Sequence, residues 1–210
     1  MKYEWKKHEK LLYLPQVEPV VIQIPKQKFL MLSGKGNPNN ELFAEAVGVL
    51  YSLAYGIRMM PKQGFTPEGY FEYTVYPLEG VWNLSETGKV LDRFNKNELL
   101  YTIMIRQPDF VTEDVVKRAF ENVRKKKPHA LLDSMTFDTI EDGLSVQMLH
   151  VGSFDEEPTS FKLMNEYMLN NNLVRTSKQH REIYISDIHK TASSKLKTVL
   201  RYSVNENSNN

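Results

Sequence analysis

The chain has 210 residues, of which 41% are hydrophobic and 25% charged, so it can bury a core of ordinary globular size. Its net charge of +1 offers no general attraction for nucleic acid or an anionic membrane. The absence of cysteine excludes disulfides, thiolate metal sites and cysteine nucleophiles, and it fits a cytoplasmic location. The charged start lacks the apolar stretch of a signal peptide, and no apolar run approaches the roughly 20 residues of a membrane span.

The first half of the chain alternates between short extended runs and one long helical pattern. Asn37 followed by Pro38 predicts the start of the helix, because asparagine caps helices and proline suits the first helical position. The expected elements are a lead-in at 1–18 with a short helix over Lys2–Leu14, strands at Val20–Ile24 and Lys28–Ser33, a helix at Glu41–Arg58, and strands at Tyr70–Tyr76 and Leu99–Arg106.

The second half begins with a helix whose ends are clearly marked. Thr112 is the expected N-cap, and the acidic first turn and basic last turn complement the helix dipole. The elements expected after it are a connector or short strand at Phe137–Asp142, a strand at Leu144–Val151, a helix capped by Asp155 and running to about Asn170, strands at Gln179–Asp187 and Thr198–Val204, and a disordered tail at 205–210.

The two halves form an internal repeat. LMLSGKGNPNNELF, at Leu30–Phe43, lies over MLHVGSFDEEPTSF, at Met148–Phe161, with Gly34 on Gly152 and the two helix caps aligned. The predicted fold is therefore α+β: two strand-helix-strand-strand repeats in pseudo-twofold symmetry, forming an antiparallel sheet with a central ligand groove. We expect one domain at 19–204, with halves at about 19–107 and 137–204 joined by the helix at 112–127.

Gln179–Asp187 carries the strongest functional signal. Its strand period places Glu182 and Tyr184 on one face and Ile183 and Ile185 on the other, where the isoleucines supply a core face. If this face is exposed to water, Glu182 and Tyr184 carry little functional information. A face roofed by aromatic side chains would instead leave Glu182 as a charge in an apolar groove, where it needs a cation or a proton donor.

Three further aromatic residues are candidates for the walls of that groove. Trp82 follows a Leu-Glu-Gly bend, and Tyr51 and Tyr55 lie one turn apart on the predicted helix. Core packing is an alternative for all three, and it is the commoner role for helical aromatics. If they line the groove, they favour a flat or cationic ligand, since each cation–π contact is worth about 0.5–2 kcal/mol.

Other chemistries lack the residues that they need. The five histidines show no metal-ligand spacing such as HExxH, so neither a metal nor a cofactor is expected. The Gly34-Lys35-Gly36 loop lacks the third glycine of a dinucleotide loop and the Lys-Ser/Thr of a phosphate loop. No Gly-x-Ser-x-Gly nucleophile elbow is present, and no segment is left over for a helix-turn-helix.

The chain resembles the GyrI-like small-molecule-binding family, which shares its fold with the effector-binding domains of AraC- and MerR-type multidrug regulators. It is most similar to stand-alone members. The matching stretches are KYEWKKHEKLLYLP, FLMLSGKGNPN, LYSLAYGIR, YPLEGVW, IRQPDFVTEDVVKRA, MLHVGSFDEEP, HREIYISD and KLKTVLR. YPLEGVW departs from the pattern, because relatives often carry a second aromatic residue where Asn83 stands.

The resemblance implies that bulky, flat and often cationic molecules bind in the central groove. It places the groove glutamate at Glu182 and the aromatic wall at Trp82 and Tyr184, with Tyr51 and Tyr55 as weaker correspondences. Similar stand-alone proteins are linked to hydrolysis of strained cyclopropane rings in DNA-alkylating toxins. The resemblance thus implies a multidrug-binding or detoxifying protein whose partners are small molecules.

Two functions follow, and both use the same residues. In the first, the protein only binds aromatic or cationic molecules, with Glu182 as the charge. In the second, Glu182 is a general base for water and Tyr184 protonates or holds the leaving oxygen. Turnover beyond one equivalent separates them. A regulator that acts through a protein partner is a third reading, and a homodimer is left open.

Overall fold

The computed structural model describes residues 2–207 and divides them into two compact units. Unit 1 comprises Gln27–Leu78 and Trp82–Ile140, together with the N-terminal residues to Glu4. Unit 2 comprises Trp5–Lys26, Glu79–Val81 and the chain from Glu141 onward. Both units combine helices with antiparallel strands, which confirms the predicted α+β class.

The elements are distributed between the units as follows. Unit 1 contains β2 (Gln27–Lys35), α3 (Glu41–Arg58), α4 (Glu86–Lys89), β4 (Leu99–Gln107), α5 (Glu113–Lys126) and β5 (Thr136–Ile140). Unit 2 contains α1 (Trp5–His8), α2 (Lys10–Tyr13), β1 (Val20–Ile24), β6 (Gly143–Val151), α6 (Glu157–Asn170), β7 (Leu173–Arg175), β8 (His180–Tyr184) and β9 (Lys197–Glu206). Strand β3 (Leu78–Leu84) has residues in both units.

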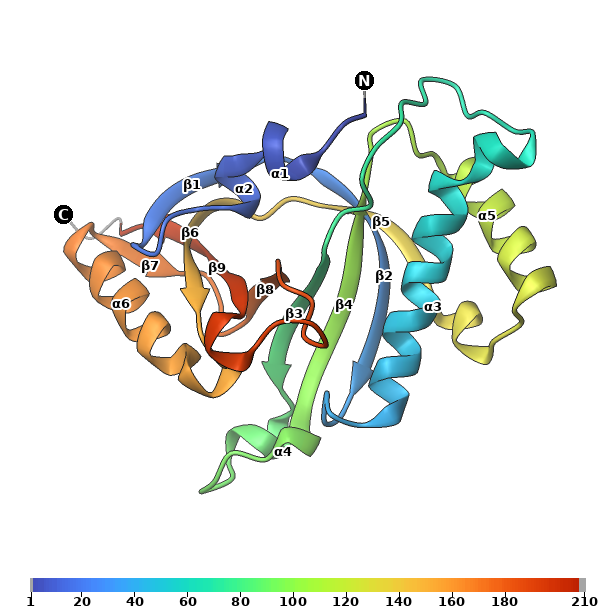
Figure 1. Cartoon of the computed structure of the whole chain (residues 1–210). Helices are drawn as coiled ribbons and strands as arrows, with labels where there is room; N and C mark the ends of the chain where they lie inside the picture. The colour runs from blue at the N-terminus through green and yellow to red at the C-terminus, as the bar shows by residue number, and fades with distance from the viewer. Residues whose placement is uncertain (1, 208–210) are drawn as a thin grey trace. The chain divides into compact units, whose positions relative to one another are not determined.

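In unit 1, a long helix covers a small antiparallel sheet. β2 pairs with β4 on one side and with β5 on the other. The helix α3 packs against β2, β4 and α5, and Figure 1 shows α3 and α5 side by side. The two helices approach closely at Gly56, where an added Cβ would lie 3.2 Å from Val123. The buried face of α3 includes Leu50, Leu53 and Ile57, at the spacing that the sequence predicts.

Unit 2 repeats this plan around β6 and β9. Its strand order is β1-β6-β9-β8, and β7 pairs with the last residues of β9. The helix α6 packs on β6 and β7 (Figure 1). Its Met164 is fully buried, and Phe161, Tyr167 and Met168 pack against the same core. In both units the strand before the long helix pairs antiparallel with a later strand, β2 with β4 and β6 with β9, which agrees with the predicted repeat.

The division between the units differs from the expected halves. Strand β1 pairs with β6, with Val21 opposite Val146, so residues 20–24 lie in unit 2. The helix α5, expected as a link, packs against α3 inside unit 1. Hydrophobic period assigns a segment to a strand or helix, but it does not choose the neighbour on which that segment packs.

The predicted strand at Tyr70–Tyr76 is wrong. The segment instead has a single parallel bridge between Tyr73 and Tyr3, and the strand forms later, as β3. The carbonyl oxygen of Tyr73 accepts a hydrogen bond from Arg58 Nε at 2.7 Å, so it is not available to a strand ladder. Aromatic packing replaces strand pairing here, because the rings of Tyr73 and its neighbours Tyr70 and Phe71 gather around Phe110.

Both predicted caps of the long repeat helices are also wrong. α3 begins after Asn40, and Asn37 Oδ1 instead accepts from Asn39 N at 3.0 Å in the preceding turn. Ahead of α6, Ser153 and Glu156 form a capping box in a 3-10 turn, in place of a cap at Asp155. Asn and Asp side chains favour turns as readily as caps. The Thr112 cap is confirmed, since its side chain accepts from Val115 N.

The chain ends need two further corrections. The expected helix over Lys2–Leu14 is divided into the short helices α1 and α2, which flank Glu9. Asn205 and Glu206, expected in the tail, belong to β9, where Asn205 pairs with Val174. Residues 208–210 of the predicted tail lie outside the described residues.

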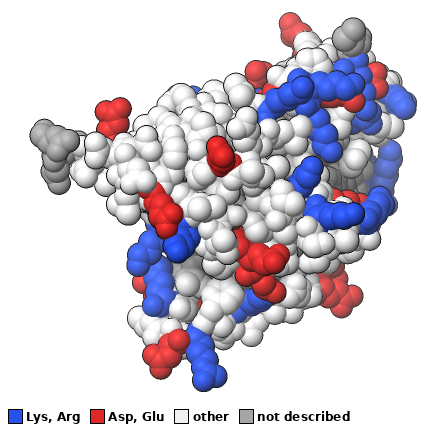
Figure 2. All heavy atoms as spheres, turned by 60° about the vertical axis from the view of Figure 1, so that its left-hand side comes forward, with Lys and Arg blue, Asp and Glu red and all other residues white. Residues whose placement is uncertain are grey.

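The surface carries charges of both signs. On the face drawn in Figure 2, acidic and basic side chains are interspersed over a largely uncharged background. Within residues 2–207, no helix combines the length and the apolar character that crossing a bilayer requires.

Candidate functional site

Strand β8 carries a hydrogen-bonded carboxylate. Tyr184 donates its hydroxyl to Glu182 Oε2 at 2.8 Å, and His180 Nε2 donates to Glu182 Oε1 at 2.9 Å. Ile183 points the other way and is fully buried beside Val199 of β9. The period-2 pattern of the sequence therefore gives the correct face for Glu182 and Tyr184.

Glu157, the first residue of α6, completes this group. Its side chain is 7% exposed and lies within hydrogen-bonding reach of Glu182, which is 9% exposed. Burial, followed by the charge of Glu182, raises the pKa of Glu157 from 4.5 to about 9. At neutral pH, Glu157 is therefore a neutral acid beside the charged Glu182. We call Glu157, His180, Glu182 and Tyr184 the carboxylate cluster.

Aromatic side chains border the carboxylate cluster within unit 2. The ring of Phe161 meets His180 edge to face, with centroids 4.8 Å apart, and Phe154 meets Tyr184 at 6.0 Å. Phe154 is 41% exposed, and Tyr184 is only partly buried. The tyrosine hydroxyl thus joins a buried carboxylate to the partly open surface of the unit.

Trp82 is packed among other aromatic residues in unit 1. It stacks on Phe43 at 5.9 Å between ring centroids and lies 5.6 Å from Tyr101, while Phe43 and Tyr101 meet edge to face at 5.0 Å. Tyr101 lies across Gly34, its partner on β2, where any added side chain would overlap its ring. Trp82 is only 6% exposed. We call Phe43, Trp82 and Tyr101 the aromatic cluster.

The remaining predicted residues form a pair on α3. The rings of Tyr51 and Tyr55 are 6.2 Å apart, and Tyr55 is 49% exposed. The structure thus joins Glu182 with Tyr184 in unit 2 and Tyr51 with Tyr55 in unit 1, while Trp82 pairs with residues that were not predicted as site residues.

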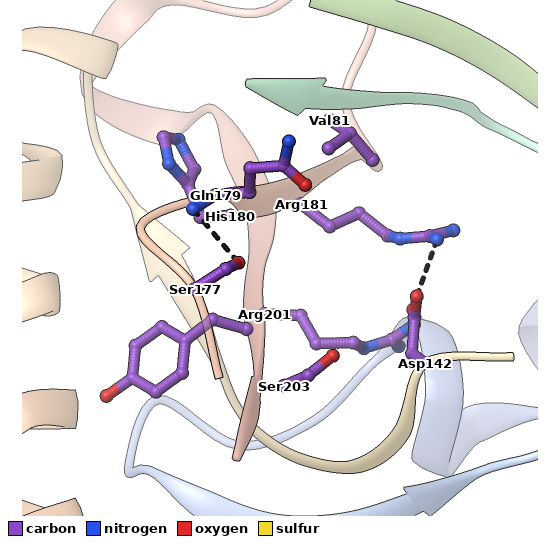
Figure 3. Close-up of a pocket in the computed structure, with 9 residues that line it drawn as sticks. Val81, Asp142, Ser177, Gln179, His180, Arg181, Arg201 and Ser203 are labelled. Carbon is purple, nitrogen blue, oxygen red and sulfur yellow. Dashed lines mark hydrogen bonds and ion pairs between the residues drawn. The ribbon is translucent and has the colours of Figure 1, made fainter. Parts of the chain in front are cut away.

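A buried ion-pair network lies beside the carboxylate cluster in the sequence and was not predicted. Arg181, 4% exposed, donates to Glu79 Oε2 and to Asp142 Oδ1, at 2.8 Å each. Arg201, opposite Arg181 on β9, donates to Gln147 Oε1 at 2.8 Å. Figure 3 shows Arg181 and Arg201 directed toward Asp142 at the side of a small pocket.

This pocket is too small for a bulky ligand. Its volume is about 70 Å³, and its walls include the two arginines together with Ser177 and Ser203 (Figure 3). Pockets that enclose drug-sized molecules measure about 300–1,000 Å³. Because the arginines are matched by Glu79 and Asp142, we interpret the network as structural.

Sequence reasoning missed Glu157 and His180 as partners of Glu182. His180 lies two residues before Glu182, so the strand period could have found it. Glu157 carries no such signal, because it lies 25 positions away on a different element. The described part of the chain contains no group of three or more His, Asp or Glu side chains able to hold a metal ion.

The repeated fold, with one helix on an antiparallel sheet in each unit, defines the chain as an α+β domain. Residues 17–203 match the GyrI-like small molecule binding domain, and the chain belongs to this family. It is therefore a small-molecule-binding domain. No protein of curated function matches it.

Solved structures support this assignment over the whole chain. A hydrolase from Listeria innocua is 39% identical, with 98% of this chain and 100% of that chain covered and a TM-score of 0.89. A second Listeria innocua structure, of an uncharacterised conserved protein, is 40% identical, with 97% and 100% covered and a TM-score of 0.89. The EcmrR C-terminal domain is 13% identical, with 90% and 98% covered and a TM-score of 0.53, and shares the fold.

Proposed function

We propose that this protein is a hydrolase that opens strained, cyclopropane-type rings in bulky aromatic electrophiles. The observation that carries the proposal is the 2.8 Å hydrogen bond from Tyr184 to the buried carboxylate of Glu182. A carboxylate removed from bulk water and bonded to a phenol can accept a proton from water and return one to an oxygen. Two further observations support this reading.

The first observation is that Glu182 already has hydrogen-bond partners. Both of its oxygens already accept hydrogen bonds, one from Tyr184 and one from His180. A buried carboxylate needs such donors in either function, and proton transfer also needs the hydrogen-bonded path that Tyr184 supplies. The second observation is that a Listeria innocua protein with 39% identity over nearly the whole chain is described as a hydrolase.

The proposed reaction adds one water molecule across the strained ring. Glu182 takes a proton from water, the resulting hydroxide oxygen bonds to a ring carbon, and the carbon–carbon bond of the ring breaks. The electron pair of that bond moves through the conjugated system to a carbonyl oxygen of the substrate, which takes the proton of Tyr184. Protonated Glu182 then returns a proton to Tyr184, and the cluster recovers its starting state.

Reversible binding of flat, often cationic molecules is the second candidate function. The aromatic cluster favours it, because stacked rings offer faces to a planar or charged ligand. In this reading Glu182 supplies charge, and Trp82, Tyr51, Tyr55 and Tyr184 supply contact surface. Either function would suit protection of the cytoplasm against toxic small molecules.

The test is turnover of an aromatic compound with a cyclopropane ring conjugated to a carbonyl, performed in ¹⁸O-labelled water. We expect many equivalents of ring-opened product carrying ¹⁸O, and at least a 100-fold loss of kcat in Glu182→Gln and Tyr184→Phe, the lower end for one acid–base group. Tyr167→Phe, a tyrosine of α6 that packs against the core of the same unit, is the matched control. Saturation at one equivalent without product would refute hydrolysis and leave the binding function.

Calorimetric titration with a rhodamine-type cation tests the binding function separately. If Glu182 supplies the charge, Glu182→Gln weakens binding more than tenfold, or by about 1.4 kcal/mol. Equal affinity in both proteins would place Glu182 outside the site that takes the cation.

A further inference from the structure

Glu157 is a buried acid that the hydrolysis scheme above does not use. Its side chain is 7% exposed, and it meets Glu182 from the start of α6, opposite strand β8. The oxygens of Glu182 accept from Tyr184 and His180. Within residues 2–207, Glu157 Oε1 has no hydrogen-bond partner. A buried carboxyl in this position is costly if it is charged.

The charged neighbours of Glu157 determine where the proton lies. Glu182 acts on it from β8 and Asp155 acts on it from the turn before α6, and both are acidic. The two hydrogen-bond donors on β8, His180 and Tyr184, serve Glu182 instead. Two adjacent buried carboxyls cannot both ionise cheaply, so one of them holds a proton. Burial and the neighbouring acids raise the pKa of Glu157, which leaves the proton on Glu157.

We propose that Glu157 is a positioning residue of this site: as a neutral acid it donates a hydrogen bond to Glu182, orients that carboxylate toward Tyr184, and switches the site off when it ionises. The inference rests on the proposed hydrolysis. Glu157 keeps its proton throughout the reaction, since water, Glu182 and Tyr184 already balance the transfer. Ionised Glu157 could no longer donate this hydrogen bond and would repel Glu182, so Glu182 would lose the orientation toward Tyr184 that proton transfer needs.

The protonation of Glu157 can be measured without substrate. In the infrared spectrum we expect a carboxylic-acid C=O band at pH 7 that disappears near pH 9, where burial and Glu182 place the pKa of Glu157. Glu157→Gln should lack this band. In Glu182→Gln the band should disappear at lower pH, because the neighbouring charge is gone. Glu166→Gln, an exposed acid on the same helix, should leave the band unchanged.

Other infrared results would overturn the assignment of the proton. A wild-type protein without the band at pH 7, or a band that persists in Glu157→Gln, would place the proton elsewhere. If Glu157→Gln does not fold, the change in titration caused by Glu182→Gln carries the test. An unchanged titration there would overturn the coupling between the two acids.

The pH profile of turnover tests the positioning role itself. We expect wild-type kcat to fall tenfold per pH unit above about pH 9, the pKa of Glu157. Glu157→Gln should retain turnover, and its kcat should not fall above pH 9, because glutamine can donate the hydrogen bond and cannot ionise. A loss of kcat that is equal at every pH would mean that Glu157 is only structural. If the wild type shows no turnover at any pH, hydrolysis and the positioning role are refuted together. If the wild type turns over and Glu157→Gln still loses kcat above pH 9, only the positioning role is refuted.

Discussion

Replacing Arg181 by methionine should destabilise unit 2 strongly. The arginine side chain is 5% exposed and is paired with Glu79, which is 1% exposed, and with Asp142, which is 15% exposed. Arg181→Met removes one cation from two carboxylates in a dry environment and leaves Arg201, 3.9 Å from Asp142, as the remaining cation. Removing one partner of a buried ion pair costs about 3–5 kcal/mol, because the remaining charge is uncompensated.

The size of this effect follows from burial, and an exposed ion pair provides the control. Lys162 and Glu166 on α6 are 3.9 Å apart, with side chains 77% and 56% exposed. Exposed pairs contribute roughly 0–1 kcal/mol, so Lys162→Met should change stability by less than about 1 kcal/mol. The difference between the two substitutions therefore measures the consequence of desolvation rather than the loss of a positive charge.

Urea unfolding followed by circular dichroism at pH 7 measures both variants. The double variant Arg181→Met/Glu79→Gln should recover part of the lost stability, because the carboxylate that loses its hydrogen bond from Arg181 Nη1 is neutralised together with the arginine. We expect a coupling of about 0.5–3 kcal/mol between the two positions. If Arg181→Met costs no more than Lys162→Met, or if the double variant shows no coupling, the network is not held together as described.

Three further predictions concern other parts of the chain. The pKa of Glu157 is raised from 4.5 to about 9. Its stabilising contribution is therefore complete below pH 4.5 and is lost as the pH rises through 9. Relative to the wild type, Glu157→Gln should gain at most about 1.4 kcal/mol of stability per pH unit between these two values. Gly34→Ala should displace the Tyr101 ring, cost about 1–3 kcal/mol and alter the fluorescence of Trp82. Thr112→Ala should cost about 1 kcal/mol by removing the cap of α5.

Each of these has a simple check by urea unfolding. The gain of Glu157→Gln should vanish near pH 4.5, and a gain that is independent of pH would contradict the raised pKa. Gly48→Ala is the control for Gly34→Ala, because a Cβ added at Gly48 meets nothing within 4 Å. Gly36→Ala is unsuitable, since Gly36 has a φ of 127°, which strains any other residue. Thr112→Ser should retain the cap, and equal losses in both threonine variants would mean that the hydroxyl is not the cause.

The sequence by itself determined the elements whose patterns are local. The helix at Glu41–Arg58 was predicted with its observed bounds, because its apolar stripe has helical spacing. The face shared by Glu182 and Tyr184 followed from the strand period alone. The repeat and the motifs along the chain identified the family, which the match over residues 17–203 confirms.

The tertiary structure decided which elements meet. Glu157 and Glu182 come from a helix and a strand 25 residues apart, and Arg181 meets Glu79 from across 102 residues. Periodicity states which face of an element is buried, but it does not say which side chain lies opposite. The same limit explains the wrong strand at Tyr70–Tyr76, where contacts with Phe110 and Arg58 replaced the ladder that the alternating pattern favours. The protonation of the carboxylate cluster, and with it the proposed chemistry, arises from these long-range contacts, because burial and neighbouring charge set a pKa and neither is written in the local sequence.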